Sequence, residues 1–305
     1  MKLNINFNFN ISRPGGRPVR SLILAVLALL IVPCALAQES PYFVTYDHHL
    51  EEPGNLELEC SSTTGLPKAG RAYNAPLVEI EYGVKAWWTS EFYLEGQSRL
   101  GDSTIFTGWR FENRFRPLAR EHRINPVLYV EYENINEASR IQKEVVGHAE
   151  PLDEPNSELR QEHAREIETK LILSSTVHDW NISENFIVEK NLVEAEPFEF
   201  GYALGISRPL SRLASGTNCR FCRENFSAGL ELFGGLGDAE RFGFGDTAHY
   251  VAPALSWRIG DNAALRISPA FGLTAGSDRF LLRVGYSYEL RGFGRKMAAM
   301  FRGGN

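Results

Sequence analysis

Apolar and polar residues alternate with a period of two along most of the chain. Between Val78 and Val84 every second residue is apolar, and the residues between them are glutamate or glycine. The stretch Phe280–Arg291 alternates in the same way, and from Ile105 to Glu112 we place the odd-numbered residues, including Thr107, on the apolar face. This period is typical of strands with one apolar face. We predict twelve strands, centred near residues 58, 80, 92, 109, 130, 170, 186, 202, 230, 253, 268 and 285.

The N-terminus predicts export. Basic residues begin the chain without any acidic residue, an apolar run follows at Leu22–Val32, and Pro33 ends it. A run of this length is too short for a membrane-spanning helix, which needs about 20 residues. Small residues at Ala35 and Ala37 match a cleavage site, so we predict a signal peptide over 1–37 and a mature chain beginning at Gln38. An N-terminal anchor or a buried core helix is the alternative.

Strand length indicates the fold class. Many predicted strands run to ten residues or more, against about 5–6 in ordinary globular proteins, and a tilted strand needs about 9–11 residues to cross a bilayer. In an exported chain this favours an all-β, transmembrane, antiparallel up-and-down barrel of about twelve strands, in which no strand edge is left unpaired. We expect an N-terminal extension at 38–54, the barrel at 55–293 and a basic tail at 294–305.

Connector lengths and tryptophans predict the orientation of the barrel. Short connectors alternate with long ones, and the long ones would face outward. The longest, 136–163, carries a helical pattern around Glu137–Val146; we expect a solvated loop, and a loop folded into the mouth is the alternative. Three tryptophans fall near the periplasmic ends of their strands and would form an interfacial girdle, although they would also fit a soluble core. They are Trp88, Trp180 and Trp257.

Two prolines and two charges are unusual for barrel strands. Pro253 and Pro269 fall within predicted strands, where each removes a ladder hydrogen bond and a bulge would accommodate it. Glu184 and Lys190 would lie on the outward face, which is costly inside lipid unless they mark a strand end.

Several segments resemble one family of outer-membrane barrels. These are Phe226–Gly237, His249–Pro253, Phe271–Thr274 and Leu282–Tyr288, together with Glu184–Glu189. They resemble the outer-membrane transporters of the phenol-degradation meta-pathway (MetA-pathway) type. The resemblance implies passage of hydrophobic or aromatic compounds. The chain departs from the general barrel pattern because it continues past Phe293 instead of ending on an aromatic residue.

We find no motif that predicts catalysis or cofactor binding. The chain has no nucleophile elbow, zinc-protease helix or phosphate loop. The adjacent His48 and His49 have no evident metal partners, so we expect solvated histidines and no metal site. The net charge of −6 leaves no broad basic face, which excludes nucleic acid as the expected partner. The expected partners are the lipid bilayer, small-molecule solutes and the barrel-assembly machinery.

Cys219 and Cys222 form a Cys-x-x-Cys pair, which can be redox-active, metal-binding or structural. Further metal ligands are lacking nearby, and the oxidising periplasm favours a disulfide in the long connector 208–223. We expect Cys60 to be a small residue of the first strand.

The polar faces predict a charged interior. Most of the predicted lumen-lining residues are acidic and form one wall; arginines on another strand and on the last three predicted strands oppose it. The predicted lumen-lining set is Glu79, Glu81, Glu91, Glu131, Glu133, Glu199, Glu231, Arg110, Arg114, Arg258, Arg266, Arg279 and Arg283. Opposed walls of charge would orient polar solutes, or the charges would pair and fill a narrow lumen.

These patterns favour a channel or transporter of the bacterial outer membrane that passes small molecules passively and is not an enzyme. A non-conducting barrel with a scaffold or adhesion role is the main alternative. A membrane hydrolase would need a Ser–His pair that no motif requires, and a secreted soluble β protein would dissolve without detergent.

Overall fold

A computed structural model describes residues 40–141, 145–149, 155–211 and 219–302. The predicted signal peptide lies outside these residues. The described part contains twelve strands: β1 (Leu56–Leu66), β2 (Tyr73–Lys85), β3 (Trp88–Arg99), β4 (Thr104–Phe115), β5 (Asn125–Asn136), β6 (His163–Val177), β7 (Trp180–Asn191), β8 (Glu199–Pro209), β9 (Phe226–Asp238), β10 (His249–Ile259), β11 (Ala263–Gly272) and β12 (Phe280–Leu290).

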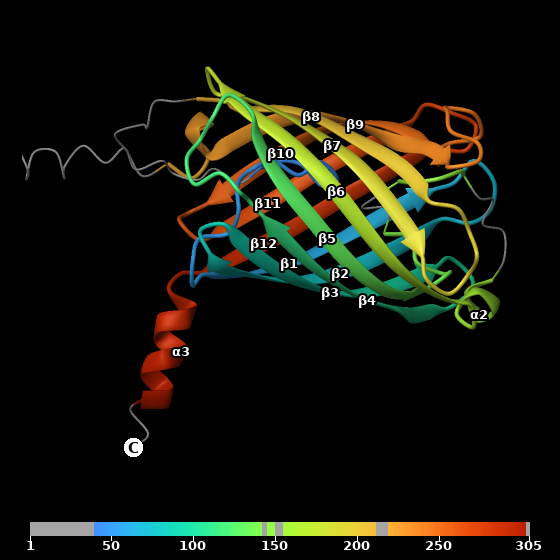
Figure 1. The fold of residues 1–305 in the computed structure, drawn as a ribbon, viewed down its shortest axis with the longest axis horizontal. Coiled ribbons are helices and arrows are strands. Elements are labelled where there is room, and N and C mark those ends of the chain that lie inside the picture. Colours follow the sequence, from blue (N-terminus) through green and yellow to red (C-terminus); the bar gives the residue numbers. More distant parts are fainter. Residues whose placement is uncertain (1–39, 142–144, 150–154, 212–218, 303–305) are drawn as a thin grey trace, which may run out of the picture. The chain divides into compact units, whose positions relative to one another are not determined.

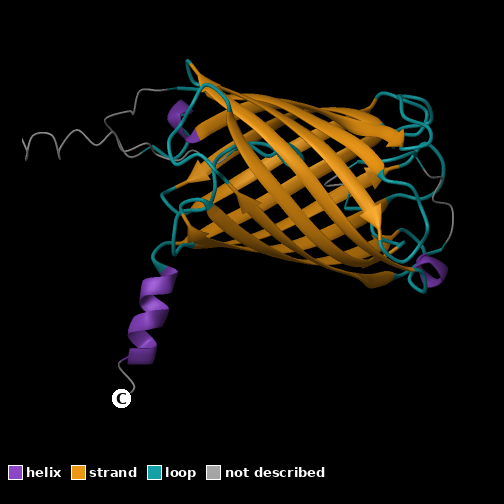
Figure 2. Cartoon of the chain, in the orientation of Figure 1, coloured by secondary structure: helices purple, strands orange, loops and turns teal. Residues whose placement is uncertain are grey.

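The strands form a closed antiparallel barrel (Figures 1 and 2). Each strand pairs with its neighbours in the chain, and β1 pairs with β12 along its whole length, from Leu56 opposite Leu290 to Leu66 opposite Phe280. All twelve predicted strand centres fall within these strands, so the predicted fold class is confirmed.

Side chains alternate between the two faces of the wall as the period of two requires. On β2, Val78 and Ile80 are 41% and 37% exposed, whereas Tyr73 and Leu77, on the other face, are each 6% exposed. Exposed apolar side chains recur around the outer surface, among them Leu94, Leu128 and Phe186. A surface this apolar matches the lipid-facing band of a membrane barrel.

The connectors lie at two ends of the barrel. The turn end carries connectors 86–87, 116–124, 178–179, 210–225 and 260–262, and the loop end carries 67–72, 100–103, 137–162, 192–198, 239–248 and 273–279. The loop end includes the short helix α2 (Asn156–Leu159), seen beside the barrel mouth in Figure 1.

Pro253 and Pro269 lie opposite one another in the β10–β11 pair. Val251 pairs with Phe271 and Leu255 with Ile267 in one continuous register, and no partners are assigned between these pairs. The ladder is thus interrupted without a bulge, because neither proline has an amide hydrogen to donate.

Downstream of β12 the chain forms helix α3 (Phe293–Arg302), which occupies most of the predicted basic tail. Gly292 joins the two elements at a φ of +63°, and its amide donates to Asn55 Oδ1 at 2.8 Å. Within the described residues, no helix has the length and apolar character needed to cross a bilayer.

Candidate functional site

The N-terminal segment enters the barrel instead of extending away from it. Residues 41–50, here called the plug, dip into the lumen from the turn end and return to it before β1 begins. At the deepest point, the amides of Phe43, Val44 and Thr45 donate to the carboxylate of Glu231 on β9, at 3.1, 2.9 and 2.7 Å. Glu231 is fully buried, so these charge-assisted bonds hold the plug backbone where water cannot compete.

Other wall residues bind the plug by its backbone and its aromatic rings. Asn185 on β7 accepts the Tyr46 amide at 2.7 Å and donates to the Tyr46 carbonyl at 2.9 Å. Arg266 on β11 donates to the Tyr42 carbonyl at 2.8 Å. The Tyr46 hydroxyl donates to Glu112 at 3.0 Å, and Lys170 lies 4.6 Å from the centre of the Tyr46 ring.

Small residues on β8 and β9 leave room for the plug. A Cβ placed on Gly205 would lie 2.7 Å from the Tyr42 ring and 2.9 Å from the Thr45 methyl group, and one on Gly229 would lie 3.0 Å from Pro41. Any side chain at Gly205 would therefore displace the plug. Glycines on the inward-facing positions of β8 and β9 are visible in the sequence, and they could have indicated that another segment fills this side of the lumen.

Part of the connector between β5 and β6 folds inward at the loop end. Val146 and Gly147 form isolated bridges with Gly201 and Gly237, and Ile141 is 4% exposed within the interior. The expected solvated loop is therefore wrong for the described residues 137–141 and 145–149. These residues are not helical; the helix of this connector is α2, and residues 142–144 and 150–154 lie outside the described part.

An apolar cluster lies between the plug and this inward-folded loop. Its wall residues range from alanine to tyrosine and come from strands around the barrel, and it includes Val44 of the plug and Ile141 of the loop. The larger wall residues are Tyr73, Leu77, Tyr93, Phe233, Tyr250 and Leu281. This part of the interior is lined by aromatic and aliphatic groups rather than by the predicted charges.

Acidic residues cluster on the inner faces of β2–β6, but two of the arginines predicted to oppose them lie within the same wall. Arg110 pairs with Glu131 at 3.3 Å, with Glu133 at 3.1 Å and with Glu95. That part of the prediction was wrong because β4 is hydrogen-bonded between β3 and β5, which carry many of these glutamates.

Arg114, four residues further along β4, also forms ion pairs with glutamates of this wall. It pairs with Glu81 at 2.7 Å, with Glu112 at 3.1 Å and with Glu91. Both arginines are therefore held in ion-pair networks inside the acidic wall.

Of the remaining predicted lining residues, Glu79 lies on the acidic wall, and the others lie on the opposite wall or at the two rims. Arg266 pairs with Glu59 of β1, and the buried Arg283 lies 4.9 Å from the Phe233 ring. Arg258 lies near the turn end, 3.5 Å from Asn225 Oδ1. Arg279 is exposed just before β12, and Glu199 begins β8 at the loop end. Glu79 is half-buried on the inner face of β2.

The predicted girdle residues lie at the turn end of the barrel, as expected. Trp88 begins β3, Trp180 begins β7 and Trp257 lies near the end of β10, all on the outward-facing register. Their role at a membrane interface remains a prediction.

Cys219 and Cys222 form a disulfide in the 210–225 connector, and the ring of Phe221 between them stacks on Trp257, with 4.8 Å between the ring centres. Cys60 is an exposed free thiol of β1 in the described part of the chain.

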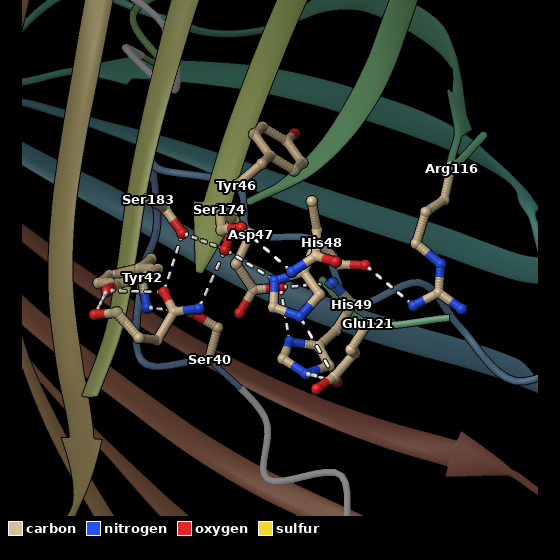
Figure 3. Close-up of polar contacts among 12 residues, drawn as sticks. Ser40, Tyr42, Tyr46, Asp47, His48, His49, Arg116, Glu121, Ser174 and Ser183 are labelled. Atoms are coloured by element: carbon tan, nitrogen blue, oxygen red, sulfur yellow. Dashed lines mark hydrogen bonds and ion pairs between the residues drawn. The ribbon is translucent and has the colours of Figure 1, made fainter. Parts of the chain in front are cut away.

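The structure also brings a serine and a histidine together, which the sequence did not predict. His48 Nδ1 lies 2.8 Å from Ser174 Oγ on β6 (Figure 3). Ser174 is 1% exposed, and its hydroxyl also contacts Asn181 at 3.1 Å and Ser183 at 2.9 Å. A hydroxyl with three polar neighbours and no exposed surface has no room for a substrate, so the pair does not form a nucleophilic site. The expectation of solvated histidines is wrong for His48, which is fully buried.

No protein-family model matches the chain, and no curated protein matches it. Among solved structures it is similar to the COG4313 outer membrane channel from Pseudomonas putida F1, with a TM-score of 0.52 and 10% identity over 80% of this chain and 98% of that one. It is also similar to the NanC porin, with a TM-score of 0.47 and 10% identity over 77% of this chain and 100% of that one.

An enzyme is among the similar structures as well. The outer membrane phospholipase A from Escherichia coli has a TM-score of 0.40 and 10% identity, over 80% of this chain and 93% of that one. At these identities the comparisons concern architecture: the chain has the fold of an outer-membrane β-barrel.

Proposed function

We propose that the protein is an outer-membrane channel for small solutes and that the plug closes it. The observation that supports this proposal most directly is that the plug occupies the interior. The plug is held by contacts from wall side chains such as Glu231 and Asn185, and it takes no part in the ladder that closes the barrel. It can therefore leave the lumen without breaking a strand pair, and a closed barrel would remain around the opened path.

The residues that line the interior favour a hydrophobic or aromatic solute. An entering molecule would meet Tyr73, Phe233 and Tyr250 in the apolar cluster, where aromatic faces bind apolar rings. The segments that resemble the MetA-pathway barrels agree with this class of solute. The acidic wall and Arg266 opposite it would orient the polar end of such a molecule.

The signal-peptide pattern and the apolar outer surface support location in the outer membrane, after insertion by the barrel-assembly machinery. Burial of the Ser174–His48 pair supports transport over catalysis, because it leaves no room for a substrate.

Conductance in planar bilayers tests the proposal. A variant lacking residues 41–50, with the export signal intact, should conduct at least several times more than the natural chain. A matched control replaces the exposed connector residues 192–196 with glycine and serine and should conduct like the natural chain. Heat-modifiable migration in gels would establish that each variant is folded.

A non-conducting barrel is the second candidate, and tight interior packing favours it. Tyr93, Tyr129, Phe233 and Tyr250 are all 0–1% exposed. A correctly folded plug deletion with no conductance would support this candidate and would overturn the channel proposal.

A further inference from the structure

Three potential metal ligands meet where the plug returns to the turn end. His48 and His49 belong to the plug, and Glu121 belongs to the connector between β4 and β5. Their ligand atoms all lie within 4.8 Å of one another. Figure 3 shows both imidazole rings beside the Glu121 carboxylate, with Nε2 of His48 at 3.6 Å and Nε2 of His49 at 3.9 Å from Glu121 Oε1.

The ring of His48 is oriented by Ser174 of β6, which contacts the ring nitrogen that does not face Glu121. Its Nδ1 lies 2.8 Å from Ser174 Oγ, while its buried Nε2 has no hydrogen-bond partner among the described residues. In the tautomer in which Nδ1 donates to Ser174, the lone pair of Nε2 faces a carboxylate oxygen. In this tautomer the two facing electron-pair donors would be stabilised by a cation between them, whereas in the other tautomer the Nε2–H group would point at the Glu121 carboxylate.

Asp47 orients the ring of His49 in a similar way, through Nδ1. The Asp47 carboxylate accepts from the backbone amide of His49 at 2.7 Å and lies 3.0 Å from its Nδ1. A carboxylate behind one ring nitrogen is the usual arrangement for a histidine that binds metal through the other, because it sets the tautomer and increases basicity.

We propose that His48, His49 and Glu121 form a site for a divalent transition metal of the zinc class, which fastens the plug to the barrel. Two imidazoles and a carboxylate match the donor set of open zinc sites, with water as fourth ligand. Tetrahedral zinc at bond lengths of about 2.0–2.1 Å separates its ligand atoms by roughly 3.3 Å. The ligand atoms lie within 4.8 Å of one another, so metal binding would draw them together by up to about 1.5 Å. Glu121 and His49, whose side chains are 63% and 49% exposed, have room for this movement.

The charge near the site also suits a cation. Asp47 and Glu121 bring two negative charges, while Arg116, which donates to the His48 carbonyl at 3.5 Å, brings one positive charge. The site opens toward solvent on the Glu121 side, which gives a metal ion a path of entry.

The metal would bias the closed state because its ligands come from two separate parts of the chain. Releasing the plug would remove His48 and His49 from Glu121 and leave only the weaker adjacent pair. If the released plug binds negligibly, metal at about 100 times its dissociation constant favours the closed form roughly a hundredfold. This consequence rests on the channel proposed above, whereas the existence of the site does not.

Equilibrium dialysis of the full mature chain in detergent, purified without a histidine tag, tests the site directly with Zn²⁺ alone. We expect one ion per chain and at least tenfold weaker binding in His49→Ala and in Glu121→Gln. The matched control is His122→Ala, the exposed neighbour in the same connector, which should bind normally. Asp47→Asn should weaken binding about 10- to 100-fold.

Equal binding by the natural chain, His49→Ala and Glu121→Gln would overturn the site, as would no binding by the natural chain. Both variants change exposed side chains, so their folding is not at risk. In bilayers, Zn²⁺ should lower the conductance of the natural chain but not of Glu121→Gln. If zinc binds as predicted and no variant conducts, the channel proposal fails while the metal site stands.

Discussion

Glu231 offers the sharpest test of how the plug is held. In Glu231→Gln the side chain keeps its size but loses its charge. With the amide oxygen in the Oε1 position, the amides of Val44 and Thr45 keep neutral acceptors, and the Phe43 amide faces an NH₂ group. One charge-assisted bond, worth about 1.5–3 kcal/mol, is lost, and two others weaken by about 1 kcal/mol each. Because such losses are not additive, we expect the plug to be destabilised by about 3 kcal/mol, roughly a 150-fold shift toward release.

Hydrogen exchange followed by mass spectrometry measures the increased release of the plug directly. The peptide covering residues 41–50 should exchange on the order of a hundred times faster in Glu231→Gln, while peptides from the strands keep their protection. Glu240→Gln, an exposed carboxylate after the same strand, is the matched control. Unchanged exchange of the plug in Glu231→Gln would refute the idea that the buried carboxylate holds it.

Three further predictions concern the interior. Gly205→Val should expel Tyr42 from the wall and raise bilayer conductance toward that of the plug deletion; a conductance equal to that of the natural chain would refute the steric argument. Arg110→Gln should leave its glutamate partners uncompensated and destabilise the barrel by about 3–5 kcal/mol, measured as a lower denaturation midpoint in detergent. In a plug-deleted background, replacing Arg266 and Arg283 with glutamine should move the reversal potential toward cation selectivity, and an unchanged potential would reject their role in selectivity.

The wall of the barrel could be predicted because its signal is local. A period of two between Val78 and Val84, or between Phe280 and Arg291, places apolar groups on one face whatever the distant chain does. Strand lengths and alternating connectors then left few architectures other than a closed barrel, and β1 paired with β12 completes it.

Register irregularities were not predictable in this way. We placed Thr107 on the outward face, but it is 2% exposed and Phe106 is 61% exposed. The pairing of β3 with β4 shifts between Glu95 and Gly96, and such a bulge moves the residues beyond it to the other face. Nothing in the alternation from Ile105 to Glu112 marks that shift.

The plug and the inward-folded loop depend on contacts between residues far apart in the sequence. Val44 meets Glu231, and Tyr46 meets Asn185, across more than a hundred residues. A short segment with mixed polarity has no period that indicates where it binds. The proposed metal ligands were hidden for a similar reason, since Glu121 is far from His48 and His49 in the sequence and meets them only where the plug returns to the turn end.

A reversible cross-link between the plug and the wall tests the central claim most directly. Pro41 and Gly229 are close enough for a disulfide, because a Cβ on Gly229 lies 3.0 Å from the Pro41 ring. In a Cys60→Ser background, the Pro41→Cys, Gly229→Cys protein should be silent in bilayers when oxidised and should conduct after reduction. Equal conductance in the oxidised and reduced states, with the cross-link verified by mass spectrometry, would contradict closure by the plug.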